Sequence, residues 1–282
     1  MIAEAEDYIT QHISDSHAVD YPCFKSGWVC ELELPRWTPV HIGNVTIDLS
    51  PTRHVVYMIL AATICTIVML VAARAHRRSQ EAGSAPKGLG NGIEATILYL
   101  RNEIIMPNVG PHGDAYVPFV LTLFFFILFA NLLGLVPYGS TATSNISVTA
   151  TLAILSFIMV EIAGIRTLGK GYIKTIVYWP SDQPFIMKAL LTPLLTPLEL
   201  ASKFTKPFAL AIRLFANMTA GHIVVLALIG LIFTFGSWFV APAPFLGALG
   251  IMLLEIFIAF LQAFVFALLT SVFIGLIREG AH

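Results

Sequence analysis

Long apolar runs separated by short polar segments make up most of this chain. Five of the runs are long enough to cross the roughly 30 Å hydrocarbon core of a bilayer as helices. They cover about residues 55–73, 117–137, 146–164, 192–235 and 239–277. The pattern predicts an all-α polytopic membrane protein with five transmembrane helices, in which residues 53–282 form the membrane domain.

Three parts of the chain fall outside these runs. Residues 1–52 mix acids, prolines and aromatic residues without an apolar run or the basic start of a signal peptide, which indicates an extramembrane segment. Residues 79–91, with their Gly, Ser and Pro, indicate a flexible linker. Residues 92–106 are too short and too charged to span. Four of their apolar side chains share one helical face, at Ile93, Ile97, Leu100 and Ile104. We expect an amphipathic helix in the membrane interface.

Composition and the placement of charge extend this picture. Hydrophobic residues make up 57% of the chain and charged residues 12%, far below the roughly 25% of soluble domains. Cations follow the first, third and fifth runs, at Arg74, His76, Arg77, Arg78, Arg166, Lys170 and Arg278. By the positive-inside rule the N-terminal segment lies outside the membrane and the C-terminus inside, which agrees with five crossings.

Cysteines and short motifs add little chemistry. Cys65 lies inside an apolar run and is expected to act as a small core hydrophobe. Cys23 and Cys30 share the polar N-terminal segment and can form a disulfide in an oxidising compartment, but their spacing leaves the pairing open. The chain has no cysteine–histidine metal spacing, phosphate-binding glycine loop or nucleophile elbow, so we expect neither a metal nor a cofactor.

The last two runs each exceed the roughly 20 residues that a perpendicular helix needs. The excess indicates a strong tilt, or an initial part that lies along the interface. Pro193, Pro197 and Pro207 favour a helix that starts late or kinks before Arg213, because proline lacks an amide donor and crowds the preceding turn. We expect a long, tilted hairpin that folds about Trp238.

Arg213 is the residue in these runs that most needs an explanation. An arginine near the bilayer centre costs roughly 2.5 to 3.5 kcal/mol even on lenient insertion scales, so it indicates function by default. At 100° per residue, four other polar side chains project within about 40° of it on the helix, namely Glu199, Ser202, Lys206 and Asn217. The alternative, an arginine neutralised by Glu255 for stability, is weaker because a hydrophobic pair would do better.

A second polar site is predicted on the other side of this helix. His222 lies about 180° from Arg213. Antiparallel packing sets residue i beside about residue 476 − i, which places Glu255 level with His222, and Gln262 level with the turn that contains Arg213 and Asn217. The level His222 and Glu255 favour a proton relay over a satisfied core histidine.

Simpler roles stay open for the other polar residues. Gln262 and Asn217 are either functional or hydrogen-bonding amides between helices. Glu199 is either a solvated interfacial acid or a proton outlet. For Lys203, Lys206 and Glu161 we favour side chains that extend to the inner membrane surface.

Three motifs resemble one family. The segment ALAIRLFANM (Ala209–Met218), preceded by a Lys-Pro step and followed by AGH, resembles the signature of the a subunits of F-type ATP synthases. LQAFVF (Leu261–Phe266) is similar to that family's last-helix motif, and NLLGLVP (Asn131–Pro137) to its first long membrane motif. The resemblance covers about Met58 to the C-terminus, and residues 1–52 match none of its motifs.

The resemblance implies a stator proton channel without catalytic activity of its own. In this family the arginine, here Arg213, faces the essential carboxylate of the c-ring, keeps it ionised and blocks direct leakage between two offset half-channels. The outer half-channel would contain His222, Glu255 and Gln262, with Asn145 and Ser147 near its mouth. The inner one would contain Glu199, with Ser202, Asn217 and Lys206 as further candidates.

The resemblance also implies the partners and the location. These are the c-ring, the subunit b stator stalk, the remaining ATP synthase subunits, lipid and protons, in a bacterial inner membrane and without nucleic acid. A titratable His–Glu pair favours H⁺ over Na⁺ as the ion. Two other classes remain: a secondary ion or solute transporter, which should show repeat symmetry that we do not see, and a structural assembly subunit, which should tolerate loss of Arg213.

Overall fold

The computed structural model describes residues 15–22, 29–43, 45–48, 50–81, 88–136, 139–175, 185–235 and 239–279. The chain divides into two compact units. Unit 1 contains Met1–Val68, Phe126–Val148 and Leu214–Gln262, and unit 2 contains Met69–Phe125, Thr149–Arg213 and Ala263–His282.

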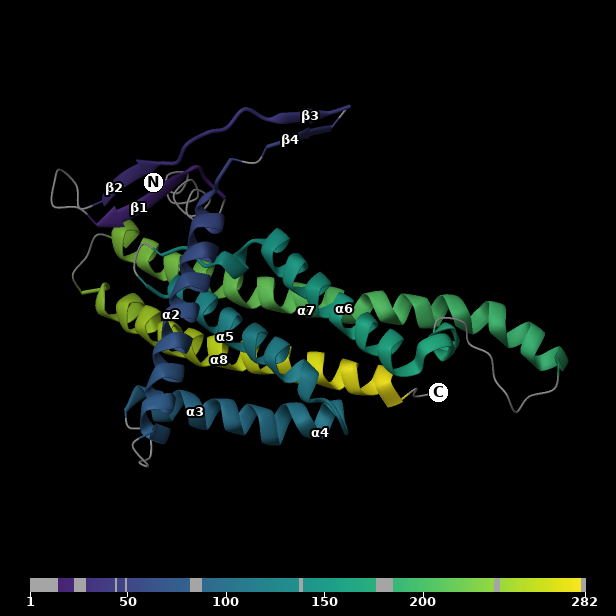
Figure 1. Cartoon of the computed structure of the whole chain (residues 1–282). Helices are drawn as coiled ribbons and strands as arrows, with labels where there is room; N and C mark the ends of the chain where they lie inside the picture. The colour runs from purple at the N-terminus through teal and green to yellow at the C-terminus, as the bar shows by residue number, and fades with distance from the viewer. Residues whose placement is uncertain are drawn as a thin grey trace. The chain divides into compact units, whose positions relative to one another are not determined.

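Five helices in the described part of the chain are long and apolar enough to cross a membrane. They are α2 (Arg53–Glu81), α5 (Val117–Gly134), α6 (Ile146–Leu168), α7 (Phe185–Phe235) and α8 (Pro242–Glu279). Each lies on one of the predicted apolar runs (Figure 1). The predicted all-α polytopic membrane class is confirmed.

Two helix boundaries differ from the expectation. α2 continues through its basic cluster to Glu81, because the alanines and arginines there are good helix formers. α7 does not start late: it is helical from Phe185 and contains Pro193, Pro197 and Pro207. Long apolar helices tolerate such prolines where neighbouring groups satisfy the freed carbonyls. Trp238, about which we expected the hairpin to fold, lies outside the described residues.

The N-terminal segment forms two small antiparallel sheets that were not predicted (Figure 1). β1 (Ala18–Pro22) pairs with β2 (Val29–Glu33), and β3 (Val40–Ile42) pairs with β4 (Val45–Ile47). Gly43 follows β3 with a φ of 62°, a left-handed conformation that suits glycine in a tight turn.

The cysteine predictions have mixed outcomes. Cys30 is disulfide-bonded. Cys23 lies outside the described residues, so the Cys23–Cys30 pairing stays a prediction. Cys65 is free and half-buried in α2.

The predicted amphipathic stretch in unit 2 is helical, but its buried face is shifted. α3 (Leu89–Tyr99) passes through a π-helical turn, η1 (Leu100–Ile105), into α4 (Met106–Val109). The π-turn inserts an extra residue, so Ile105 is buried at the position expected for Ile104, together with Leu100 and Val109.

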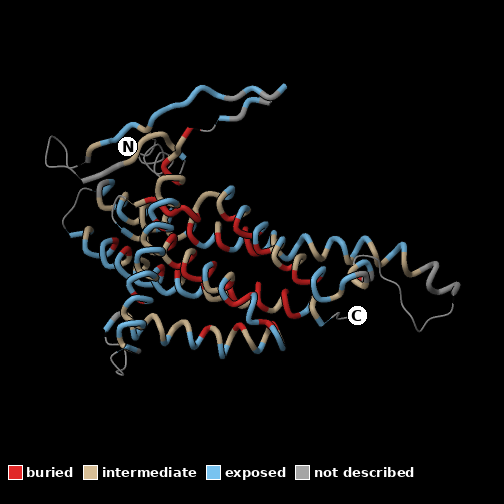
Figure 2. Tube along the Cα trace, in the orientation of Figure 1, coloured by how far each residue is buried: buried red, intermediate tan, exposed pale blue. Residues whose placement is uncertain are grey.

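Close helix contacts stabilise each unit. In unit 2 the end of α8 packs on α4, where a Cβ added to Gly275 would lie 1.9 Å from the Asn108 carbonyl oxygen. Arg278 donates to the Val109 and Pro111 carbonyl oxygens, which places a cation at the C-terminus of α4. In unit 1, Ala61 of α2 packs against Ala130 and Ala142. Figure 2 shows buried and exposed stretches following one another along the same helices.

Candidate functional site

Within unit 1, Glu255 of α8 lies beside Gly221 of α7, one residue from His222. This agrees with the predicted antiparallel register. A Cβ added to Gly221 would lie 2.0 Å from Glu255 Oε1, so the carboxyl group of α8 rests against the α7 backbone next to His222. Glu255 is 3% exposed, and its Oε1 has no hydrogen-bond partner among the described residues. A buried carboxyl oxygen without a partner is costly, and such groups mark functional sites more often than structural ones.

Two further contacts along the same hairpin confirm the register. Asn217 Nδ2 donates to Gln262 Oε1 at 3.0 Å. Closer to the hairpin end, Gly247 of α8 lies against the side chain of Leu228. Gln262 is buried, and its Nε2 has no partner within the part of the chain that the structure describes. The Asn217–Gln262 pair therefore joins the two helices and leaves one amide donor available.

His222 is held by a residue that the sequence did not identify. Its Nε2 is hydrogen-bonded to Thr141 Oγ1, in the connection between α5 and α6. Gly134 makes room for Thr141, because a Cβ there would lie 1.7 Å from Thr141 Oγ1. Beside it, Thr143 Oγ1 donates to Asn131 Oδ1 at 2.6 Å. The sequence feature that could have pointed to Thr141 is the short polar turn directly after the NLLGLVP motif.

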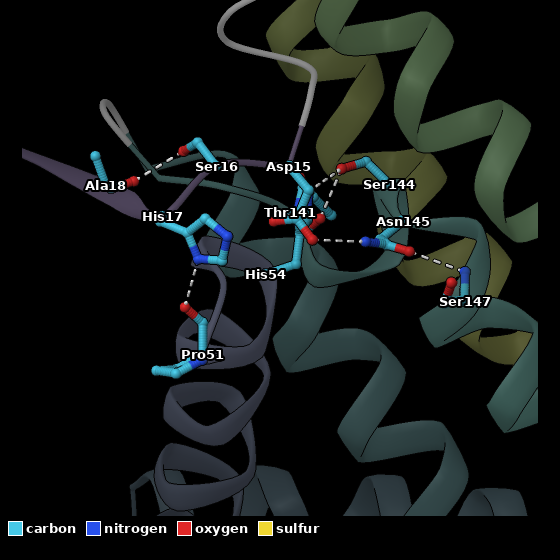
Figure 3. A network of polar contacts seen from close by, with 10 residues as sticks. All are labelled: Asp15, Ser16, His17, Ala18, Pro51, His54, Thr141, Ser144, Asn145 and Ser147. Carbon is cyan, nitrogen blue, oxygen red and sulfur yellow. Dashed lines mark hydrogen bonds and ion pairs between the residues drawn. The ribbon is translucent and has the colours of Figure 1, made fainter. Parts of the chain in front are cut away.

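Asn145 and Ser147, the predicted mouth residues, form a helix cap. The Asn145 side-chain oxygen accepts from the Ser147 amide at 2.9 Å, the usual bond of a residue that precedes a helix, here α6 (Figure 3). Asn145 Nδ2 donates to Asp15 Oδ2 at 3.2 Å. The N-terminal segment therefore brings a carboxylate to this position.

Arg213 is exposed on α7, and among the described residues it forms no ion pair with an acid. Glu255, the acid that the sequence offered as a partner, rests its carboxyl group against Gly221 within unit 1. By helical spacing, the exposed residues within one turn of the arginine on its own face are small, at Ala209, Ala216 and Asn217, and Lys206 and Ala220 follow two turns away on either side. Small residues let a partner helix approach closely.

The rest of the predicted polar stripe lies beside a pocket in unit 2. The pocket has a volume of about 220 Å³, and its polar lining consists of Ser156, Glu161, Thr175, Glu199, Lys203 and Lys206. Ser202 is not part of the lining and donates to the Leu198 carbonyl of its own helix. Lys206 is exposed, with its ammonium 5.4 Å from the ring centre of Phe273.

The expectation that Lys203 and Glu161 extend to the membrane surface is wrong. Lys203 Nζ lies 3.5 Å from Glu161 Oε1, and the two side chains are only 10% and 19% exposed. Lys203 also donates to Tyr172 Oη and to Thr175 Oγ1. An ammonium with so little exposure needs several acceptors, and the acid and the two hydroxyls supply them.

Known proteins resemble this chain over most of its length. A family profile described as ATP synthase A chain matches residues 55–275. ATP synthase subunit a of Chloroherpeton thalassium is 42% identical over 265 residues, which cover 94% of this chain and 74% of that protein. Subunit a of Anaeromyxobacter dehalogenans is 41% identical over 95% of this chain and 70% of its own length. Subunit a of Chlorobium phaeobacteroides is 41% identical over 99% and 80%. With most of its length matched by both the profile and these relatives, the chain belongs to the ATP synthase A chain family.

Proposed function

We propose that this chain is the stator subunit that forms two offset proton half-channels beside a rotating c-ring, and so couples proton flow to rotation and ATP synthesis. The observation that carries the proposal is Arg213, an exposed cation in a membrane-spanning helix without an acid partner among the described residues. Such a charge persists in lipid only where something outside the chain compensates it. A ring carboxylate that has lost its proton would do so.

The surroundings of Arg213 support this role. The small residues Ala209, Ala216 and Ala220 on its face leave space for a ring helix. At a few ångströms, the guanidinium favours the ionised carboxylate and keeps a proton from passing directly between the half-channels. Each charge that crosses the membrane supplies about 2.3 kcal/mol per 100 mV.

The outer half-channel consists of the polar groups of unit 1. Thr141 is hydrogen-bonded to His222, and the Glu255 carboxyl group packs against Gly221, the residue before His222. The Asn217–Gln262 pair lies farther along the hairpin. Two buried atoms of this path, Glu255 Oε1 and Gln262 Nε2, have no partner among the described residues, and they are an acceptor and a donor available to a passing proton.

The inner half-channel is the unit 2 pocket. Its volume of about 220 Å³ has room for several waters, and Glu199 and Lys206 provide polar partners for them. We infer that Glu199 releases the proton here, and that the Lys203–Glu161 pair holds the pocket wall.

This function sets the orientation and the partners. Residues 1–52 lie outside a bacterial inner membrane, residues 53–282 form the membrane domain, and the C-terminus faces the cytoplasm, in keeping with the cations after α2, α6 and α8. Residues 92–106 lie in the interface. The c-ring, subunit b and the other synthase subunits are the partners.

The test is ATP-driven proton pumping by inverted membrane vesicles that carry Arg213→Ala. We expect pumping to fall to background while the assembled complex stays at the normal level, because the passing carboxylate loses its counter-charge. The matched control is Arg166→Ala, which removes an exposed arginine near the end of α6. Normal pumping by Arg213→Ala would reject the proposed function.

A further inference from the structure

A second histidine, buried where the N-terminal segment meets α2, is joined to the outer polar path. His54 is 2% exposed. Its Nδ1 lies 2.7 Å from Asp15 Oδ1, and its Nε2 lies 3.2 Å from Ser144 Oγ (Figure 3). Both ring nitrogens therefore have a polar partner, one from the N-terminal segment and one from the connection between α5 and α6.

The hydrogen bonds of this cluster require an additional proton. Ser144 Oγ donates its own hydrogen to the Thr141 carbonyl at 2.7 Å, so toward His54 it acts as an acceptor. His54 Nε2 must then carry a hydrogen. Nδ1 faces a carboxylate, which is an acceptor when ionised, so a second hydrogen lies between His54 and Asp15. The Asp15–His54 pair thus holds one proton more than a neutral imidazole beside an ionised acid.

The surroundings favour the ionised form of Asp15. Burial raises the pKa of Asp15, but the hydrogen bond and the charge of His54 outweigh it and lower the pKa below its usual value of 3.8. Asn145 also donates to the other Asp15 oxygen. Of the other ionisable neighbours, Arg53 is buried next to His54 in the chain, and His17 is engaged with the Pro51 carbonyl. Asp15 is the acid that faces the His54 ring.

Thr141 connects this pair to the site described above. Its carbonyl accepts the Ser144 hydrogen, and its hydroxyl is hydrogen-bonded to His222 Nε2. Thr141 is 1% exposed. All these residues belong to unit 1. Thr141 therefore contacts the His54 cluster through its carbonyl and His222 through its hydroxyl.

We propose that Asp15 and His54 form a proton-loading site at the outer mouth of the half-channel, so that the N-terminal segment is a working part of the path. This inference rests on the proposed function. The proton on Nε2 leaves toward Ser144, which leaves a neutral imidazole beside the Asp15 carboxylate, and a proton from the outer solution then re-protonates the pair. One proton enters for each one that leaves, and the pair returns to its starting state.

The test measures proton flux through the whole ATP synthase in vesicles, at a fixed membrane potential, while the pH on the side of the N-terminal segment is varied. For His54→Gln and Asp15→Asn we expect a lower flux at neutral and alkaline pH. In Asp15→Asn the pH of half-maximal flux should also move down by about one unit, because His54 loses a close counter-charge. His17→Gln, the same substitution at a neighbouring histidine outside the path, should leave the profile unchanged.

Asp15→Asn decides the result if His54→Gln fails to assemble, because it keeps the size of the side chain. Wild-type pH profiles for both variants in assembled complexes, or the same shift in His17→Gln, would overturn the loading site. Arg213→Ala is measured in parallel. If it abolishes flux while the Asp15 and His54 variants behave as wild type, only the loading site is wrong. If Arg213→Ala retains flux, the proposed function itself is wrong.

Discussion

Gly221 has no side chain, and this decides where the Glu255 carboxyl group lies. The added Cβ would be 2.0 Å from Oε1 and 2.9 Å from the carboxyl carbon, so glycine alone leaves the acid its position beside His222. The contact lies at the tip of a flexible side chain, and a substitution would displace the carboxyl group more readily than the helices.

Gly221→Ala should therefore impair proton flux more than assembly. We expect flux to fall about tenfold or more, since displacing a functional group by about 1 Å can cost a hundredfold. ATP-driven pumping per assembled complex is the measurement. Gly230→Ala is the control, because nothing lies within 4 Å of an added Cβ there on the same helix. Equal pumping by the two variants would contradict the role given to Gly221.

Single residues differ in how far the sequence predicts them. The level of His222 and Glu255 follows from the equal rise of two antiparallel helices, and the contact at Gly221 confirms it. Thr141 and His54 were missed, because their partners lie 81 and 39 positions away in the chain. Lys203 was misplaced for the same reason: Glu161, 42 positions away, holds it inside the protein. Periodicity within one helix carries no information about such contacts.

At the scale of elements, α8 depends on a glycine where it meets α4. A Cβ on Gly275 would lie 1.9 Å from the Asn108 carbonyl oxygen and 3.0 Å from its carbon, both backbone atoms that cannot move aside alone. Arg278, one turn farther on, donates to the Val109 and Pro111 carbonyls and depends on the same close approach.

Gly275→Ala should destabilise the protein by about 1 to 3 kcal/mol, the usual cost of overpacking a close contact. Thermal inactivation of the purified complex measures the effect, and we expect it at a lower temperature than in the wild type. In Gly250→Ala, which adds the same methyl group to α8 where nothing lies within 4 Å, the temperature should not change. Unchanged thermal stability of Gly275→Ala would refute the packing argument.

The long helices were predictable, and the irregular elements were not. Apolar runs longer than the bilayer thickness leave few alternatives to a helix. The π-turn at Leu100–Ile105 shifts the buried face by one residue, and a regular period of 3.6 cannot indicate it. The four strands of the N-terminal segment have three to five residues each, too few for alternation to stand out.

At the scale of the whole molecule, the two units would have different tasks in proton transfer. Unit 1 would collect protons through Asp15, His54, Thr141, His222 and Glu255, and unit 2 would release them through the pocket at Glu199. Arg213 is the last residue of its unit 2 segment, and the ring carboxylate would exchange protons on either side of it. The apolar pattern and three motifs predicted this class and family, whereas the part played by the N-terminal segment needed the structure.

The proposed function requires that the Arg213 face lies beside the ring. Cysteine cross-linking in native membranes measures this proximity. Ala216→Cys places a thiol one turn from the arginine on the same exposed face, and a second cysteine is placed beside the ring carboxylate. Ile59→Cys, at a residue of α2 that is 58% exposed, is the control. We predict an oxidant-dependent adduct between this chain and a ring subunit for Ala216→Cys alone. No adduct, or equal adducts from both positions, would contradict the account.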